Sequence, residues 1–235
     1  MGTSKMFLRN LMAVSIVVGL LAFWSTPALA SATPQERIDK AISILREMAS
    51  EEDSWRMGKL LSDARGVAVF PSVIKVGLML GGQHGDGFML LRDPSSGRWS
   101  GPNFVSISGA SFGLQIGVQS IGLVLVITND EGVKGFMADQ VKLSGDLSVA
   151  AGPVGRHTEA GTDTRFEASI YSYTIAKGLF AGMSLEGAVV RVDRNANAAY
   201  WGGPVTAPEA LKRPASDSRI LPVLRELENI MTKTQ

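Results

Sequence analysis

The side chains that could activate a nucleophile or bind a metal are few in this 235-residue sequence. It contains two histidines, His84 and His157, and no cysteine. Asp86 follows His84 at a spacing that places both side chains on one face of a strand. Two ligands leave most of a metal's coordination sphere empty. We therefore predict no catalytic residues, no metal site and no bound cofactor, and keep hydrolysis at His84 and Asp86 only as a remote third hypothesis.

Glycine-rich stretches could instead hold a phosphate. The stretch from Gly81 to Gly87 lacks the terminal Lys-Ser/Thr of a nucleotide-binding loop. Gly109, Gly113 and Gly117 recur every four residues in a strand-like pattern, which places all three on one face. Glycine inside a strand commonly marks a bend, a bulge or a close backbone approach. We therefore interpret these glycines as structural.

The first thirty residues resemble a targeting segment. Lys5 and Arg9 precede an apolar run, and Ala28-Leu29-Ala30 provides small residues where a signal peptidase cleaves. The alternative is an uncleaved membrane anchor, but a membrane-spanning helix needs about 20 apolar residues and this run is shorter. We predict cleavage near Ala30 and a periplasmic or secreted protein. Without cysteine the chain has neither a disulfide nor a lipid-modified cysteine.

Charge argues against nucleic acid as a partner. The whole chain has 23 Lys and Arg against 22 Asp and Glu. Loss of residues 1–30 removes two basic residues and no acidic ones, so the remainder has 21 against 22, a net charge of −1. Nucleic-acid binding needs clustered cations to neutralise phosphates.

Hydrophobic periodicity predicts two helices followed by many strands. Thr33-Pro34-Gln35-Glu36 is typical of a helix start, and the apolar stripe that follows fits either a core helix or a membrane-surface helix; its mixed charges favour the core. A second helix is expected over 54–63, and a short one after Asn129-Asp130. The expected strands cover 67–70, 73–80, 87–92, 98–101, 104–108, 111–119, 123–128, 141–143, 146–151, 165–176, 179–191 and 199–201.

These elements predict an α+β fold with N-terminal helices packed on a mainly antiparallel, glycine-rich curved sheet or barrel. A short internal helix and a C-terminal amphipathic helix complete it. We divide the chain into a signal peptide (1–30), one domain (31–203), and a polar linker with the terminal helix (204–235). That last helix is expected either to dock on the sheet or to bind a partner.

An ordered series of motifs resembles the SYLF family of lipid-binding domains. The series is RGVAVFP (65–71), GRWSGP (97–102), ASFGLQIGVQS (110–120), GDLSVAAGPVGR (145–156), IYSYTIAKGLFAGMSLEG (170–187) and AYWG (199–202). Two departures stand out. Gly122 replaces an expected aspartate, and Ser144 replaces a glycine.

The resemblance implies a non-enzymatic domain that binds lipid, and together with the predicted export it points to phospholipid or anionic membrane surfaces of the cell envelope. The alternative is a structural module that binds an envelope protein without contacting lipid. Basic residues near anionic lipid contribute roughly 1 kcal/mol each, and an apolar side chain could enter the bilayer. The candidate lipid-binding residues are Lys75, Lys134, Arg156, Lys177 and Phe180.

Overall fold

The computed structural model describes residues 31–52, 54–152, 168–176, 179–180 and 185–233. Within these ranges, the side chains of residues 78–80, 111–116 and 179–180 are not described. Ala32 to Gln235 form a single unit, separate from Met1 to Ser31. Arg156 and Lys177, two of the predicted site residues, lie outside the described residues.

The N-terminal helices form where their caps and apolar stripes predict. Helix α2 (Pro34–Ser50) begins with a capping box in which Thr33 and Glu36 exchange side-chain and backbone hydrogen bonds. Helix α3 (Ser54–Ser62) follows. The stripe of α2, including Ile38, Leu45 and Met48, is fully buried. The preference for a core helix over a membrane-surface helix is therefore confirmed for this face.

Two long strands dominate the sheet. Strands β1 (Gly66–Arg92) and β2 (Trp99–Ile127) are antiparallel, and the predicted turn after Asp93 joins them. The predicted ends of separate short strands at Pro71 and at Gly81-Gly82 are wrong, because β1 runs through both. Pro71 is tolerated because the register between the two strands shifts between Phe70 and Val73, so no ladder hydrogen bond from its nitrogen is required.

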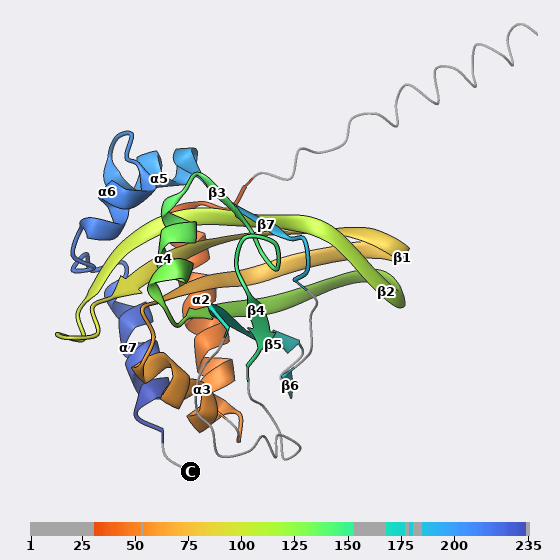
Figure 1. Cartoon of the computed structure of the whole chain (residues 1–235), viewed down its shortest axis with the longest axis horizontal. Coiled ribbons are helices and arrows are strands. Elements are labelled where there is room, and N and C mark those ends of the chain that lie inside the picture. Colours follow the sequence, from red (N-terminus) through yellow and green to blue (C-terminus); the bar gives the residue numbers. More distant parts are fainter. Residues whose placement is uncertain (1–30, 53, 153–167, 177–178, 181–184, 234–235) are drawn as a thin grey trace, which may run out of the picture. The chain divides into compact units, whose positions relative to one another are not determined.

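Strand β1 turns back upon itself, and glycines permit it. A Cβ atom on Gly81 would lie 1.9 Å from the Val76 carbonyl oxygen, and one on Gly87 would lie 2.3 Å from the Val69 carbonyl oxygen. No side chain fits at such distances. The pairing with β2 shifts again between Gly77 and Met79, where both strands bend at the end of the sheet (Figure 1). The structural interpretation of Gly81 and Gly87 is confirmed.

The remaining strands extend the sheet on either side of β2. The order is β3-β7-β2-β5-β4, with β1 on β2 and β6 on β5, and only β4 with β5 is parallel. This confirms the predicted mainly antiparallel curved sheet among the described residues. The bounds are β3 Gln140–Lys142, β4 Val149–Ala151, β5 Ile170–Ala176, β6 Leu179–Phe180 and β7 Val189–Val192.

Four shorter helices complete the fold. Helix α4 (Asp130–Met137) is capped by Asn129, which accepts a hydrogen bond from the Gly132 amide. The strand predicted over 199–201 is wrong, because these residues close helix α5 (Arg194–Trp201). The Asp193 side chain caps that helix, and Gly202 ends it with a φ of 76°. Helices α6 (Ala207–Lys212) and α7 (Leu221–Met231) follow.

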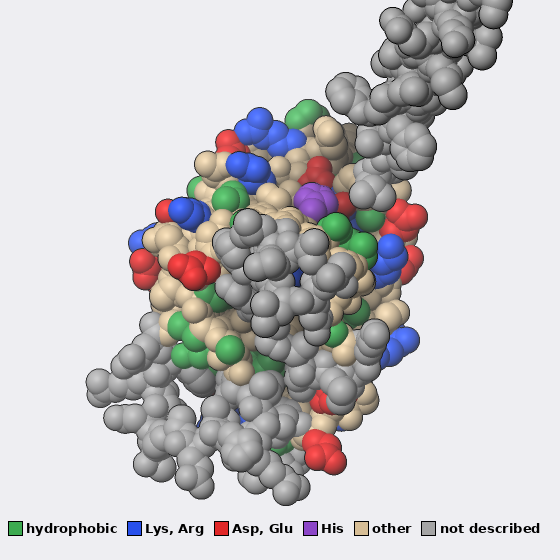
Figure 2. Space-filling model, turned by 90° about the vertical axis from the view of Figure 1, so that its right-hand side faces the viewer, with side chains coloured by type: hydrophobic (Ala, Val, Ile, Leu, Met, Phe, Trp, Pro, Cys, Tyr) green, Lys and Arg blue, Asp and Glu red, His purple; other side chains and the backbone are tan. Residues whose placement is uncertain are grey.

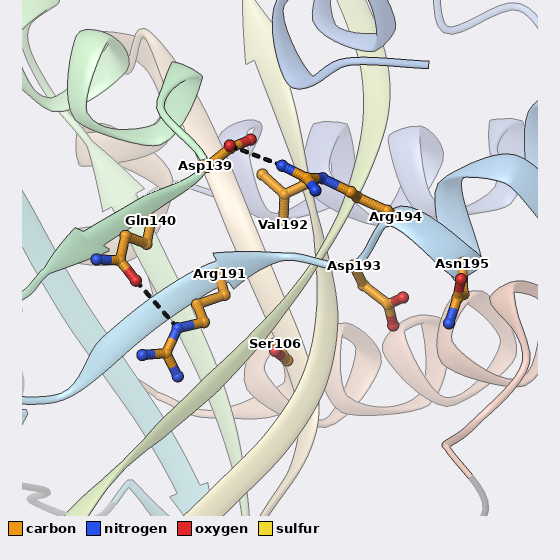
Figure 3. A pocket seen from close by; sticks show the side chains of 8 residues that line it. All are labelled: Ser106, Asp139, Gln140, Arg191, Val192, Asp193, Arg194 and Asn195. Atoms are coloured by element: carbon orange, nitrogen blue, oxygen red, sulfur yellow. Dashed lines mark hydrogen bonds and ion pairs between the residues drawn. The ribbon is translucent and has the colours of Figure 1, made fainter. Parts of the chain in front are cut away.

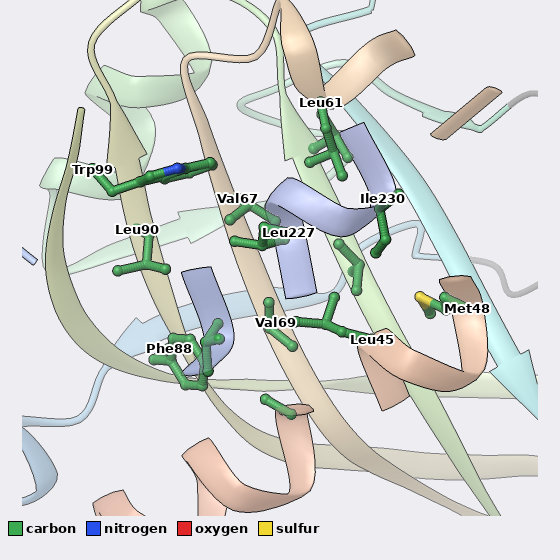
Figure 4. Packing of buried hydrophobic residues seen from close by; sticks show 14 of the residues in the cluster. Leu45, Met48, Leu61, Val67, Val69, Phe88, Leu90, Trp99, Leu227 and Ile230 are labelled. Carbon is green, nitrogen blue, oxygen red and sulfur yellow. The ribbon is translucent and has the colours of Figure 1, made fainter. Parts of the chain in front are cut away.

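The terminal helix α7 belongs to the hydrophobic core. Val223, Leu227 and Ile230 are fully buried and share a cluster with Leu45, Leu61, Val67, Val69 and Phe88 (Figure 4). At the crossing with α3, a Cβ atom on Gly58 would lie 2.1 Å from the Ile230 carbonyl oxygen. The helix therefore docks on the domain, and its apolar face is occupied.

A second cluster packs on the other side of the sheet. It joins alternate residues of β1, β2 and β7 to Phe136 of α4, and includes Phe70, Val105, Ile107, Leu125 and Val190. Successive residues of β2 point to opposite faces of the sheet, so this strand contributes side chains to both clusters. Within the described part of the chain, no helix has the length and apolar character needed to cross a membrane.

Candidate functional site

The pair His84 and Asp86 forms, but a buried arginine shares its carboxylate. His84 Nε2 lies 3.7 Å from Asp86 Oδ1. The other oxygen, Asp86 Oδ2, accepts a hydrogen bond from the Ala32 amide at 3.2 Å and lies 3.6 Å from the Arg37 guanidinium. Arg37 is 1% exposed. Asp86 therefore holds the start of α2 against β1, and its carboxylate is shared with these groups rather than dedicated to His84.

Arg37 also connects α2 to the start of α5. Its guanidinium donates to the carbonyl oxygens of Ala32, Gly87 and Val105 and pairs with Asp193 at 2.5 Å. Burial raises the pKa of Asp193, but hydrogen bonds from the Ala196 amide and from Arg37 outweigh it, so this pKa lies below its ordinary value. The network is a structural clamp in which one buried guanidinium contacts two carboxylates.

One sequence match to a catalytic motif also proves structural. Gly109 to Gly113 fits the Gly-x-Ser-x-Gly pattern of a nucleophile elbow. An elbow needs a sharp turn between a strand and a helix, whereas these residues run inside strand β2 and pair with β1. Among the residues that the structure describes, no group of three or more metal-ligating side chains occurs.

A polar pocket of about 490 Å³ opens over β7 and the start of α5 (Figure 3). Arg194 pairs with Asp139 at 2.7 Å, and the Nε of Arg191 donates to Gln140 Oε1 at 3.1 Å. The lining residues are Ser106, Asp139, Gln140, Arg191, Val192, Asp193, Arg194 and Asn195. Sequence reasoning missed this pocket, since its members come from β2, β3, β7 and α5.

An apolar surface lies where β1 and β2 bend. We call it the bend surface and define it by Ile74, Val76 and Val118, whose side chains are 37%, 51% and 69% exposed. Val76 pairs directly with Val118, and Ile74 follows on the same face. Figure 2 views that end of the molecule and shows several hydrophobic side chains at its surface. Apolar side chains grouped in this way commonly mark an interaction surface.

The strands that carry the bend surface are almost free of charge. Residues 99–129 contain no charged side chain, and Lys75 is the single lysine or arginine in residues 66–85, where no acid occurs either. This absence of charge was available in the sequence. It was overlooked because a continuous apolar run is equally typical of a buried strand.

The two described candidate lysines lie at opposite ends of the sheet. Lys75 is half-buried beside the bend surface, and projects from the other face of β1. Lys134 is exposed on α4, which follows the far end of β2 at Ile127. The six residues between Ile121 and Ile127 alone span roughly 20 Å, and Figure 1 shows α4 well away from the bend. These lysines do not converge on one site.

The backbone of Phe180 lies nearer to the bend. Phe180 pairs with Ile175 of β5, and Ile175 pairs in turn with Gly122 of β2. Its side chain is outside the described residues. A Cβ atom on Gly122 would lie 3.1 Å from Ile175 and 3.3 Å from Ile44, so the position where we expected an aspartate faces apolar side chains. Ser144, where we expected a glycine, has a φ of 57°.

The fold and its surfaces define a mainly antiparallel α+β domain with an exposed apolar bend, and comparison places it in a family. Residues 108–233 match the family Ysc84, described as "Las17-binding protein actin regulator". The chain belongs to this family, also called SYLF, whose members are in general non-catalytic binding domains. The family prediction is confirmed at this level, and the match includes the terminal helix.

Curated relatives extend the similarity toward the N-terminus. SH3 domain-containing YSC84-like protein 1 of Bos taurus is 32% identical over 195 residues, covering 79% of this chain and 57% of the relative. Its Xenopus laevis counterpart is 34% identical, with 69% and 50% covered. Protein YSC84 of Saccharomyces cerevisiae is 34% identical, with 81% and 42% covered. The chain thus spans about half the length of the curated relatives it matches.

Proposed function

We propose that this chain is an exported, non-enzymatic domain that binds phospholipid membranes of the cell envelope, and that the bend surface is the part that enters the bilayer. The observation that carries the proposal is the exposed trio Ile74, Val76 and Val118 at the bend, in segments 66–85 and 99–127 that contain no acidic residue. Such a surface can enter a bilayer, because its apolar side chains move out of water and no charged group is left without a partner.

The binding free energy expected from these side chains is suited to reversible membrane binding. Full burial of a valine or isoleucine side chain stabilises by roughly 1.5 to 3 kcal/mol, and these three are already partly covered. Lys75 lies between Ile74 and Val76 in the chain and reaches the headgroup layer from the other face of the strand, adding about 1 kcal/mol on an anionic surface. The bend surface therefore supplies most of the affinity, and the lysine contributes a preference for anionic lipid.

Vesicle co-sedimentation tests the proposal. Residues 31–235 should pellet with phosphatidylglycerol-containing vesicles, and less completely with phosphatidylcholine vesicles. The double variant Val76→Ser with Val118→Ser should lose at least tenfold in affinity for both, because two apolar side chains no longer gain from leaving water. Equal binding by the variant and the wild type would remove the bend surface from the proposal.

Export remains part of the proposal, with cleavage near Ala30. The positive start, the apolar run and the small residues before Ser31 support it. Expression of the whole chain in a bacterium, followed by mass measurement of the periplasmic product, tests it. The expected result is the mass of a chain that begins at Ser31. A full-length product in the cytoplasm would contradict export, and it would not affect the conclusion drawn from the vesicle experiment.

The alternative is an envelope module that binds only a protein. That hypothesis assigned partner binding to the terminal helix, but Val223, Leu227 and Ile230 are fully buried. Absence of vesicle binding at low salt, together with a concentration-dependent increase in mass in light scattering, would favour a protein contact at the bend surface instead.

A further inference from the structure

Among the described residues, one arginine beside the polar pocket makes no ion pair. Asp139 pairs with Arg194, and Asp193 pairs with Arg37. Arg191 is exposed, and its hydrogen bond runs from Nε to the neutral oxygen of Gln140. In formal charge the two lining arginines balance the two lining aspartates, but no described carboxylate forms an ion pair with the Arg191 guanidinium, and its terminal nitrogens face the pocket without a described partner.

The sheet register places hydrogen-bonding groups beside this guanidinium. Arg191 pairs with Ser106 of β2 on one side and with Gln140 of β3 on the other, so all three project from one face. The Ser106 side chain is short, so it leaves open space at the bottom of the pocket. Asn195 lies on the opposite wall (Figure 3). The pocket volume of about 490 Å³ suits a small organic ligand.

We infer that this pocket binds an oxyanion of the phosphate class through the terminal nitrogens of Arg191, with Ser106 and Asn195 as further hydrogen-bond donors. Arginine presents two parallel N–H groups that match two phosphate oxygens. The oxyanion is either a free phosphate compound or the phosphate of a lipid headgroup. The inference goes beyond the bilayer contact, because Ser106 lies seven strand residues, roughly 23 Å, from the pairing at Gly113 next to the bend.

Titration of the full chain tests the inference and separates the two sources. The probes are inorganic phosphate, glycerol 3-phosphate and a short-chain phosphatidylglycerol below its critical micelle concentration, followed by the NMR shift of the arginine Nε–H signals. Saturable binding of the first two assigns free phosphate compounds, and binding of the lipid alone assigns a headgroup. No saturable binding of any probe overturns the inference.

Three variants decide whether Arg191 binds the oxyanion. Arg191→Gln should weaken binding at least tenfold, because a charge-assisted bidentate contact is lost. Asp139→Asn should strengthen binding about threefold at low salt, since it frees Arg194 from its ion pair, and the gain should shrink as salt is added. Arg98→Gln, an exposed arginine in the turn between β1 and β2, serves as the matched control and should change nothing.

The result is independent of the vesicle experiment. Val118→Ser should bind phosphate as the wild type does, because Val118 lies outside the pocket. An Arg191→Gln protein that folds with the wild-type melting temperature yet binds phosphate equally well would overturn the inference even if vesicle binding persists.

Discussion

The same two strands pass through opposite environments along their length. Near the helices, Val67, Val69 and Phe88 of β1 are fully buried beneath α2, α3 and α7. At the bend, Val76 of β1 and Val118 of β2 are 51% and 69% exposed. The residue types are alike, and the difference lies in what covers them. An apolar strand thus serves as core where helices cover it and as a candidate binding surface where they do not.

Removal of the terminal helix should produce the largest effect, and it acts on the covered part of the strands. Deletion of Ser218 to Gln235 removes four fully buried residues, Ile220, Val223, Leu227 and Ile230. Each truncation of such a side chain costs about 2 to 5 kcal/mol, so their combined loss is comparable to the whole stability of a typical domain, about 5 to 15 kcal/mol. We expect no cooperative thermal transition in circular dichroism.

A single substitution refines this test. Leu227→Ala should lower the free energy of unfolding by about 2 to 5 kcal/mol in urea titrations. Glu228→Gln, on the exposed side of the same helix, should stay within about 0.5 kcal/mol of the wild type. A truncated protein that still melts cooperatively would show that α7 is an accessory to the core.

Arg37→Leu should have the next largest effect. It leaves the carboxylates of Asp86 and Asp193 without their buried partner, and breaking a buried ion pair in this way costs about 3 to 5 kcal/mol. Combination with Asp193→Asn should recover part of that loss, because the orphaned charge disappears. The urea-unfolding double-mutant cycle measures the coupling, and simple additivity of the two substitutions would contradict the clamp.

The clamp also predicts a pH dependence with a definite sign. The pKa of Asp193 is lower in the folded protein than its unfolded value, which is about 3.9. Its contribution to stability is therefore complete above that unfolded pKa and is lost as the pH falls through the folded pKa. In urea titrations below about pH 4, the free energy of unfolding of the wild type should fall more steeply with decreasing pH than that of Asp193→Asn. Identical pH dependence of the two proteins would contradict the prediction.

Local sequence signals predicted the elements better than the sites. The capping box at Thr33 and the turn after Asp93 depend on neighbouring residues, and both formed as predicted. Helix α5 was missed because residues 199–201 were interpreted as a strand, although its local signals, the Asp193 cap and Gly202 at its end, are present in the sequence. The pocket around Arg191 joins four elements through strand register, which no local pattern specifies. Exposure of Val118 likewise depends on which strand segment the helices cover.

Identical substitutions in the covered segment and at the bend should separate core from surface. Val69→Ser should cost at least about 2 kcal/mol of unfolding free energy, because it opens a cavity and buries a hydroxyl group. Val118→Ser should change that free energy by no more than about 0.5 kcal/mol. Both are measured in urea, and an equally large loss at Val118 would mean that the bend surface is covered in solution, for example by a second copy of the chain.

The smallest expected effect concerns the two lysines that the sequence grouped together. Lys75→Gln should weaken binding of residues 31–235 to anionic vesicles about fivefold, which corresponds to roughly 1 kcal/mol near the lipid surface. The loss should fade as salt rises toward 0.5 M, because screening shortens the range of the charge. Lys134→Gln is the matched control, since its side chain lies on α4 beyond the far end of β2. If Lys134→Gln weakens vesicle binding as much as Lys75→Gln, the membrane contacts a broad cationic face rather than the bend of β1 and β2.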